Sequence, residues 1–203
     1  KPALLPQLVP GSLDVKLYFT PGTCSLAPHI ALREAGLDFD LVRVDIRQRT
    51  LTDGSDFLAI DPKGDVPVLE LEDGRYLTEV PAIVQYIADR IPECGLAPRP
   101  YTLERYQLQE WLAFISSELH KAFVPLFRPD TPEDYKRSIK ENLAGHLGYV
   151  AGRLEGRNYL LGDRFTVADG YLFTVLGWGH AVAIDIGQWP SLLAFLERVG
   201  QRQ

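Results

Sequence analysis

The stretch that decides the fold of this chain reads Lys16-Leu17-Tyr18-Phe19-Thr20-Pro21-Gly22-Thr23-Cys24-Ser25. A short apolar strand runs through a Pro-Gly turn into a cysteine, and residues 25–35 then have the apolar spacing of a helix. The N–H groups and the positive dipole end at a helix start favour an anion, so we expect a low-pKa thiolate at Cys24. This position makes Cys24 a candidate reactive group.

Strand and helix patterns alternate from this stretch as far as residue 90. The patterns predict strands at 15–19, 39–44, 68–71 and 75–77, helices at 25–35, 56–59 and 79–90, and a polar turn region at 47–55. The run Glu72-Asp73-Gly74 favours a hairpin between the last two strands. The order of elements indicates a βαβ unit and an α/β domain over residues 15–91.

A second, all-helical domain is expected after a linker at residues 92–100. Three prolines and a glycine interrupt both periodicities between Ile91 and Pro100. Helical spacing follows at 103–123, 132–154, 166–183 and 190–198, and these segments make up a domain over residues 101–203. The run from Thr166 to Asp169 has the form of a capping box, with Thr166 capping, Asp169 reaching back and Phe165 as a hydrophobic staple.

Composition narrows the classes of function. With 203 residues, of which 46% are hydrophobic, the chain is long enough for one large domain or two small ones. Acidic residues outnumber basic ones by 27 to 21 with no dense basic run, which argues against nucleic-acid and membrane partners. The two cysteines, Cys24 and Cys94, have neither disulfide-framework nor metal-ligand spacing, so we expect no metal, a reducing cytoplasmic location, and a structural role for Cys94.

Residues 1–14 are set aside as a leader. Prolines interrupt their apolar run, which is too short for a signal-peptide core or a membrane span. Residues 8–12 look like the remnant of a vector or protease site, and the chain contains no methionine, so we expect the printed start to differ from the natural one.

Several motifs, in order along both halves, connect the chain to a known family. They are Tyr18 to Leu26 (Tyr-x-x-Pro-Gly-x-Cys-Ser-Leu), Asp61 to Pro67, Leu77 to Glu79, Ile83 to Asp89, Glu118 to Lys121, and Pro125 to Pro129. From Lys16 to near its end the chain resembles the bacterial beta-class cytosolic glutathione transferases. The resemblance implies a thioredoxin-like N-terminal domain, an all-helical C-terminal domain and a homodimer.

The resemblance also implies an activity. Glutathione would be the co-substrate, and the enzyme would conjugate it to electrophiles, or carry out thiol-disulfide exchange or peroxide reduction through Cys24, in detoxification and redox chemistry. The small-molecule partner would be an electrophile or a disulfide. The alternative is a non-catalytic protein of the same fold that binds glutathione or another ligand.

Four predicted site positions follow from the motifs. Cys24 would lie opposite the glutathione sulfur and form a mixed disulfide, although a free cysteine is often a small buried hydrophobe. Val66, before a cis Pro67, would pair with the peptide like an added strand, although a trans proline could simply start an edge strand. Glu79 and the N–H of Val80 would hold the γ-glutamyl end, although Glu79 could serve only its own helix.

The second domain is expected to complete the site. His120 would assist at the sulfur and Lys121 would bind near the glycyl carboxylate, which Arg49 could also reach, although a helical histidine is more often merely solvated. Ser117 and Glu118 would contact glutathione, Glu118 across a dimer interface, with an exposed helix face as the alternative. Ser25 could donate to the glutathione thiolate or cap its helix, and we favour the cap.

Three residues depart from the family pattern. Val80 stands where the family usually has Ser or Gly, Ala113 where it commonly has Asn, and Asp65 in place of the usual Gln. The first two remove contacts to glutathione, and Asp65 adds negative charge. Phe114, Phe123 and Trp178 could line the electrophile pocket, but we expect most of them in the core.

Overall fold

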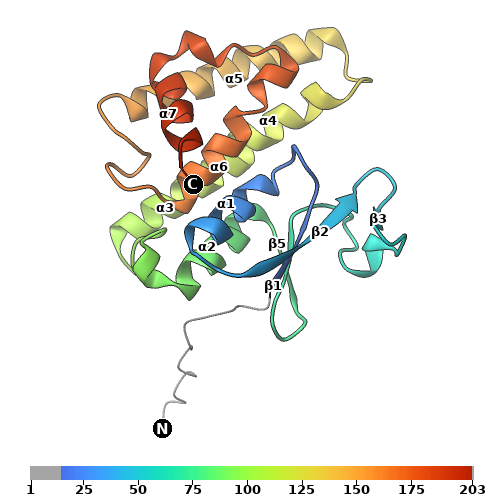
Figure 1. The fold of residues 1–203 in the computed structure, drawn as a ribbon. Helices are drawn as coiled ribbons and strands as arrows, with labels where there is room; N and C mark the ends of the chain where they lie inside the picture. The colour runs from blue at the N-terminus through green and yellow to red at the C-terminus, as the bar shows by residue number, and fades with distance from the viewer. Residues whose placement is uncertain (1–14, 203) are drawn as a thin grey trace.

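The computed structural model describes residues 15–202, and Figure 1 shows how its elements are arranged. The predictions for residues 1–14 lie outside this range. A five-stranded sheet has the order β3-β2-β1-β4-β5. Its strands are β1 (Val15–Phe19), β2 (Phe39–Asp45), β3 (Thr50–Leu51), β4 (Val68–Glu70) and β5 (Tyr76–Thr78).

The sheet confirms the predicted βαβ unit and hairpin. β1 and β2 are parallel, with Val15 opposite Phe39, and helix α1 (Leu26–Glu34) connects them. β4 and β5 are antiparallel, and Gly74 has the positive φ of 79° that their turn requires. β3 was not predicted, because a strand of two residues is too short to show alternation.

The helices follow the predicted order with two differences. They are α2 (Val80–Arg90), α3 (Leu103–Phe114), α4 (Lys121–Phe123), α5 (Glu133–Leu154), α6 (Val167–Leu176) and α7 (Pro190–Gly200). The expected helix at 103–123 is interrupted by a π-helical segment, η3 (Ile115–His120). The helix expected to reach residue 183 ends at Leu176, because Gly177 is a poor helix former and a 3₁₀ turn, η5 (Gly179–Val182), follows it.

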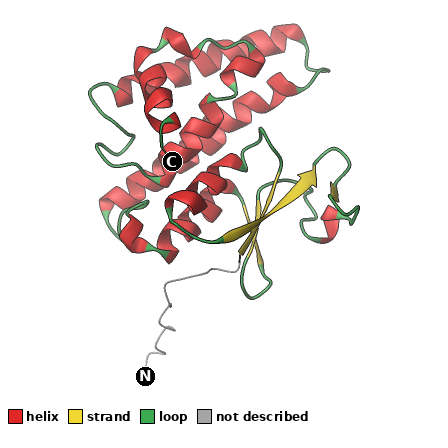
Figure 2. Cartoon of the chain, viewed as in Figure 1, coloured by secondary structure: helices red, strands yellow, loops and turns green. Residues whose placement is uncertain are grey.

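One hydrophobic core joins the two halves of the chain. Helices α1 and α2 lie between the sheet and the longer helices of the second half (Figures 1 and 2). Gly170 on α6 allows α1 to approach closely, since a Cβ there would lie 3.3 Å from Ile30. A smaller cluster around Phe57 covers the other face of the sheet. None of the helices within residues 15–202 combines the length and the apolar character that a bilayer crossing requires.

Polar contacts also hold the halves together. Arg105 on α3 is only 5% exposed, pairs with Asp89 on α2, and donates from Nε to the Pro98 carbonyl at 2.8 Å. The Trp178 indole, beyond α6, donates to the Gly22 carbonyl at 3.1 Å. The Trp178 bond fixes the loop that carries Cys24 relative to the helical domain.

Candidate functional site

A cleft of about 720 Å³ lies between the two halves of the chain and brings together most of the predicted site residues. Those in its lining are Cys24, Arg49, Val66, Pro67, Glu79, Val80, His120 and Lys121. They come from the loop after β1, the segment between β2 and β4, the start of α2, and the junction of η3 with α4. Residues far apart in the sequence therefore share one cavity.

Cys24 is a protonated thiol in this structure. Its Sγ donates to the Val66 carbonyl at 3.3 Å. Burial of the thiol raises the pKa of Cys24 to about 12, and the nearby Asp65 and Glu79 carboxylates act in the same direction. The predicted low pKa is therefore wrong here, because the cost of burying the thiolate outweighs the backbone hydrogen bonding that favours it. Conversion to a nucleophile requires removal of this proton.

Ser25 stabilises the loop that carries Cys24. Its hydroxyl donates to the Thr20 carbonyl at 3.0 Å and accepts from the Thr20 N–H at 3.2 Å. The side chain is 2% exposed and makes no capping bond to α1. The favoured capping role is therefore wrong, and the same bonds turn the hydroxyl toward the loop backbone. Ser25 therefore stabilises the local turn between Thr20 and Ser25 instead of the start of α1.

The Val66–Pro67 peptide bond is cis, as predicted. Both residues line the cleft, and Val66 meets Cys24 through the bond between its carbonyl and Sγ. The turn thus lies directly against the Cys24 sulfur. A peptide that paired with Val66 would run past Cys24.

Glu79, predicted to hold the γ-glutamyl end of glutathione, has unusual backbone geometry. Its φ is +69°, which is rare for a residue with a side chain and recurs at binding sites. Its Oε1 accepts from Lys63 Nζ at 2.7 Å, and Lys63 also donates to the Thr78 hydroxyl at 3.0 Å. The Lys63 bond lowers the pKa of Glu79 below its usual value. Glu79 is thus an ionised carboxylate at the N-terminus of α2.

The charges of the cleft suit a ligand with both signs of charge. Its lining contains the cations Arg49, Lys63, Lys121 and Arg128, and the carboxylates Asp65 and Glu79. The Arg49 side chain passes close to Gly64, where a Cβ would lie 3.0 Å from Nε. Within residues 15–202, no three or more His, Cys, Asp or Glu side chains are grouped to hold a metal ion.

The helical wall of the cleft is formed by His120 and the side chains around it. His120 Nδ1 lies 2.7 Å from the Tyr171 hydroxyl, and its ring packs edge-on against Trp178 with centroids 4.9 Å apart. Burial, together with the nearby positive charge of Lys121, lowers the pKa of His120 to about 4. His120 is therefore a neutral imidazole at neutral pH.

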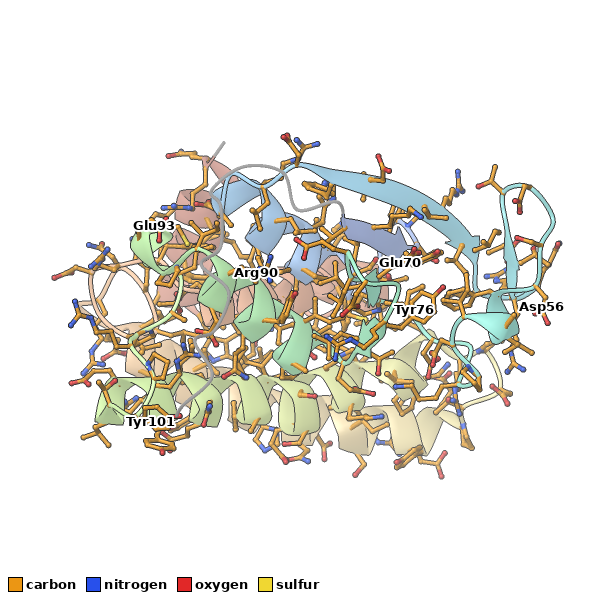
Figure 3. The ribbon with its side chains drawn as sticks, turned by 90° about the horizontal axis from the view of Figure 1, so that it is seen from below. Asp56, Glu70, Tyr76, Arg90, Glu93 and Tyr101 are labelled. Carbon is orange, nitrogen blue, oxygen red and sulfur yellow. The ribbon has the colours of Figure 1, made fainter. Side chains whose placement is uncertain are left out.

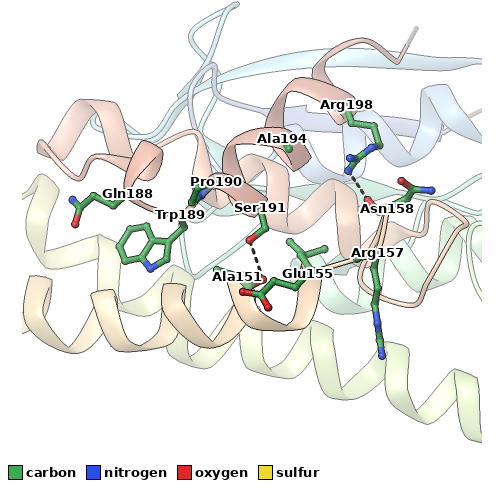
Figure 4. Close-up of a pocket in the computed structure, with 12 residues that line it drawn as sticks. Ala151, Glu155, Arg157, Asn158, Gln188, Trp189, Pro190, Ser191, Ala194 and Arg198 are labelled. Atoms are coloured by element: carbon green, nitrogen blue, oxygen red, sulfur yellow. Dashed lines mark hydrogen bonds between the residues drawn. The ribbon is translucent and has the colours of Figure 1, made fainter.

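A second pocket, of about 560 Å³, lies between the end of α5 and the start of α7 (Figure 4). The Ser191 hydroxyl donates to the Ala151 carbonyl at 2.9 Å, and Arg198 donates to the Asn158 carbonyl at 2.9 Å. These two bonds connect α7 to the end of α5 and to the segment that follows α5. None of the predicted site residues lines this pocket, so the cleft around Cys24 is the candidate site.

Comparison with known proteins assigns the family. The profile of the glutathione S-transferase N-terminal domain matches residues 22–90, and that of the C-terminal domain matches residues 114–203. The chain belongs to the glutathione S-transferase family. It is 48% identical to the glutathione S-transferase GstA of Escherichia coli O157:H7, over 93% of this chain and 94% of that protein.

Solved structures agree with this assignment. A sphingomonad glutathione S-transferase complexed with glutathione and the bacterial beta-class enzyme of Sphingomonas chungbukensis are each 49% identical to this chain. In each case the match covers 92% of this chain and 93% of the other, with a TM-score of 0.89. The predicted thioredoxin-like and all-helical fold and the beta-class resemblance are confirmed.

Some predicted residues of this glutathione S-transferase lie outside the cleft. Ser117 and Glu118 are exposed and hydrogen-bond to each other at 2.8 Å. Their neighbour Ser116 lines the cleft instead. Ala113 is also exposed and away from the lining. The roles assigned to Ser117 and Glu118 stay predictions, including the contact of Glu118 across a dimer.

Sequence reasoning missed several residues that line the site of this glutathione S-transferase, among them Lys63, Ser116 and Tyr171. Lys63 belongs to the Asp61–Pro67 motif and could have been found there. Tyr171 lies in a continuous apolar run, where an aromatic residue is indistinguishable from core. Trp178 was expected mainly as core, yet it lines the cleft and packs on His120.

Proposed function

We propose that the cleft binds glutathione, conjugates it to small electrophiles and exchanges thiol for disulfide through Cys24. The observation that carries the proposal is the meeting of Cys24, Val66–Pro67, Glu79 and His120 in one cavity of a glutathione S-transferase. A γ-glutamyl tripeptide needs a partner for its sulfur, an edge for its backbone, and charged groups for its ends. The cleft supplies each of them.

The tripeptide is proposed to lie with its sulfur between Cys24 and His120. Its cysteinyl backbone would pair with Val66, and its ammonium group would meet the Glu79 carboxylate. The carboxylate of its glycine would face Arg49 and Lys121. The negative charge that Lys63 maintains on Glu79 supports this orientation.

Two reactions are proposed at this position. In conjugation, the glutathione thiolate forms a bond to an electrophilic carbon while the leaving group departs with its electron pair. In thiol exchange, the Cys24 proton passes to solvent and the thiolate attacks a glutathione disulfide: a Cys24–glutathione S–S bond forms, the original S–S bond breaks, and the released thiolate takes up a proton. In peroxide reduction, the same thiolate would break the O–O bond and become a sulfenic acid, with release of an alcohol or water. Two glutathione molecules would then return it to the thiol, forming glutathione disulfide and water.

Retention on immobilised glutathione, followed by two turnover assays, tests the proposal. The assays use a chromogenic aryl halide and a glutathione mixed disulfide. We expect retention, elution by free glutathione, and turnover in at least one assay. A protein that neither binds the matrix nor turns over either substrate would contradict the enzyme and leave only the non-catalytic alternative.

A homodimer in the cytoplasm is proposed as the setting. Apolar side chains are exposed on β5 and around the start of α3, and Figure 3 labels two of them, Tyr76 and Tyr101. Tyr101 is 93% exposed and Leu103 is 69% exposed, so this face is suited to burial against a second copy. Both cysteines are unpaired, in keeping with a reducing compartment.

Replacing Val80 with serine is expected to strengthen glutathione binding. Val80 is the first residue of α2 and lines the cleft without offering a side-chain donor. A hydroxyl there can donate to the γ-glutamyl carboxylate, so the KM for glutathione should fall about fivefold, equivalent to about 1 kcal/mol. Val80→Ala is the control for the change in volume. Equal KM values for the serine and alanine variants would contradict the prediction.

A further inference from the structure

Tyr171 is a buried side chain that reaches the candidate site from α6. It is 1% exposed, yet it contributes to the lining of the cleft. Its hydroxyl lies 2.7 Å from His120 Nδ1, and the two rings are nearly perpendicular at 88°. The contact joins residues 51 positions apart, at the end of η3 and within α6.

The surroundings of Tyr171 determine which atom donates in this contact. Burial raises the pKa of the phenol above its usual value, so the hydroxyl keeps its proton. A neutral phenol is a stronger acid than a neutral imidazole N–H, and an imidazole nitrogen is a stronger base than a phenol oxygen. At 2.7 Å the Tyr171 hydroxyl therefore donates its proton to His120 Nδ1.

His120 can accept this bond because its ring is neutral. A neutral imidazole carries one proton, and a donor at Nδ1 places that proton on Nε2. Among the described residues 15–202, no group forms a hydrogen bond with Nε2, and His120 lines the cleft. In the opposite tautomer, a bare Nε2 lone pair would face any anionic sulfur in the cleft and repel it.

We propose that Tyr171 is a positioning residue that holds His120 in the Nε2–H tautomer, so that the neutral ring donates a hydrogen bond to the glutathione sulfur. The inference rests on the proposed function, because it needs the thiolate in the cleft. Tyr171 touches neither substrate nor sulfur in this role. It acts through His120 by fixing both the ring orientation and the position of its proton.

The tautomer can be measured directly on the unmodified protein. Nitrogen NMR of protein labelled with ¹⁵N-histidine distinguishes a protonated ring nitrogen from a bare one. The chain has four histidines, and His120→Gln identifies the signal by its loss. We expect His120 to show a protonated Nε2 and a bare Nδ1 at pH 7. A protonated Nδ1 would overturn the proposal whatever the activity of the protein.

Tyr171→Phe removes the hydroxyl and keeps the ring. We expect kcat for aryl-halide conjugation to fall about tenfold while the KM for glutathione changes less than about twofold. The His120 nitrogen signals should move toward a mixture of tautomers. Tyr159→Phe is the matched control: its buried hydroxyl accepts from Arg202 at 3.2 Å and lies outside the cleft, so kcat should be unchanged.

A double variant separates positioning from a structural effect. Because Tyr171 acts through His120, adding Tyr171→Phe to His120→Gln should cost no further activity. An additional tenfold loss in the double variant, or full kcat in Tyr171→Phe, would overturn the proposal. If Tyr171→Phe folds poorly, the His120 tautomer in the unmodified protein still tests the proposal. If the unmodified protein neither binds nor turns over glutathione, the proposed function is wrong. The tautomer measurement needs no glutathione, so it tests the role of Tyr171 separately from that function.

Discussion

Replacing Cys24 with alanine is expected to abolish turnover of glutathione mixed disulfides, with a loss of at least about a thousandfold. Thiol exchange needs a sulfur that forms the new S–S bond, and Cys24 is the cysteine that lines the cleft. Conjugation uses the sulfur of glutathione itself, so aryl-halide turnover should change only a few-fold. Parallel assays of the two reactions measure this separation.

Two further variants control this experiment. Cys94→Ala removes the other cysteine, which lies in the turn Pro92–Cys94 outside the cleft, and should leave both activities unchanged. Cys24→Ser keeps a donor for the Val66 carbonyl without the exchangeable sulfur, so it should behave like alanine in disulfide turnover. Disulfide reduction that survives in Cys24→Ala would contradict the role assigned to this thiol.

Replacing Asp169 with alanine is expected to lower the free energy of unfolding by about 3 kcal/mol. Asp169 is fully buried and accepts three bonds at 2.8 Å, from the Leu160 N–H and from the N–H and hydroxyl of Thr166. Burial raises the pKa of Asp169 to about 6, so it is charged at pH 7. Alanine would leave buried donors without an acceptor, and Tm should fall by roughly 6–12 °C.

Asp163→Ala is the matched control for this loss. Asp163 is exposed and accepts a single bond, from Asn158 at 3.3 Å, so its removal should change the free energy of unfolding by less than about 0.5 kcal/mol. Asp169→Asn keeps one acceptor oxygen and should fall between the two. Calorimetry of the three variants tests the order, and equal Tm values for Asp169→Ala and Asp163→Ala would contradict it.

Much of the fold could be predicted because its signals are local. The Pro-Gly turn before Cys24, the Asp-Gly hairpin at Gly74 and the capping box from Thr166 to Asp169 each depend on residues a few positions apart, and all three are present in the structure. The misjudged elements have weaker local signals. The π-helical segment Ile115–His120 keeps nearly the same apolar spacing as an α-helix.

The site could be predicted only in part. Cys24, Val66, Glu79 and His120 were found through motifs, and the structure brings them into one cleft. Tyr171 was missed because its role comes from a partner 51 positions away. No motif could report that contact.

The sequence by itself determined the order of the elements and the domain types, because turns, caps and apolar periodicity are properties of neighbouring residues. Its motifs carried the resemblance to the family. The tertiary structure alone decided the chemical state of the site. Burial raises the pKa of Cys24 and lowers that of His120, and long-range packing places the Tyr171 hydroxyl against the imidazole. Protonation and hydrogen-bond direction depend on which groups meet after folding, and that information is absent from any short stretch of the chain.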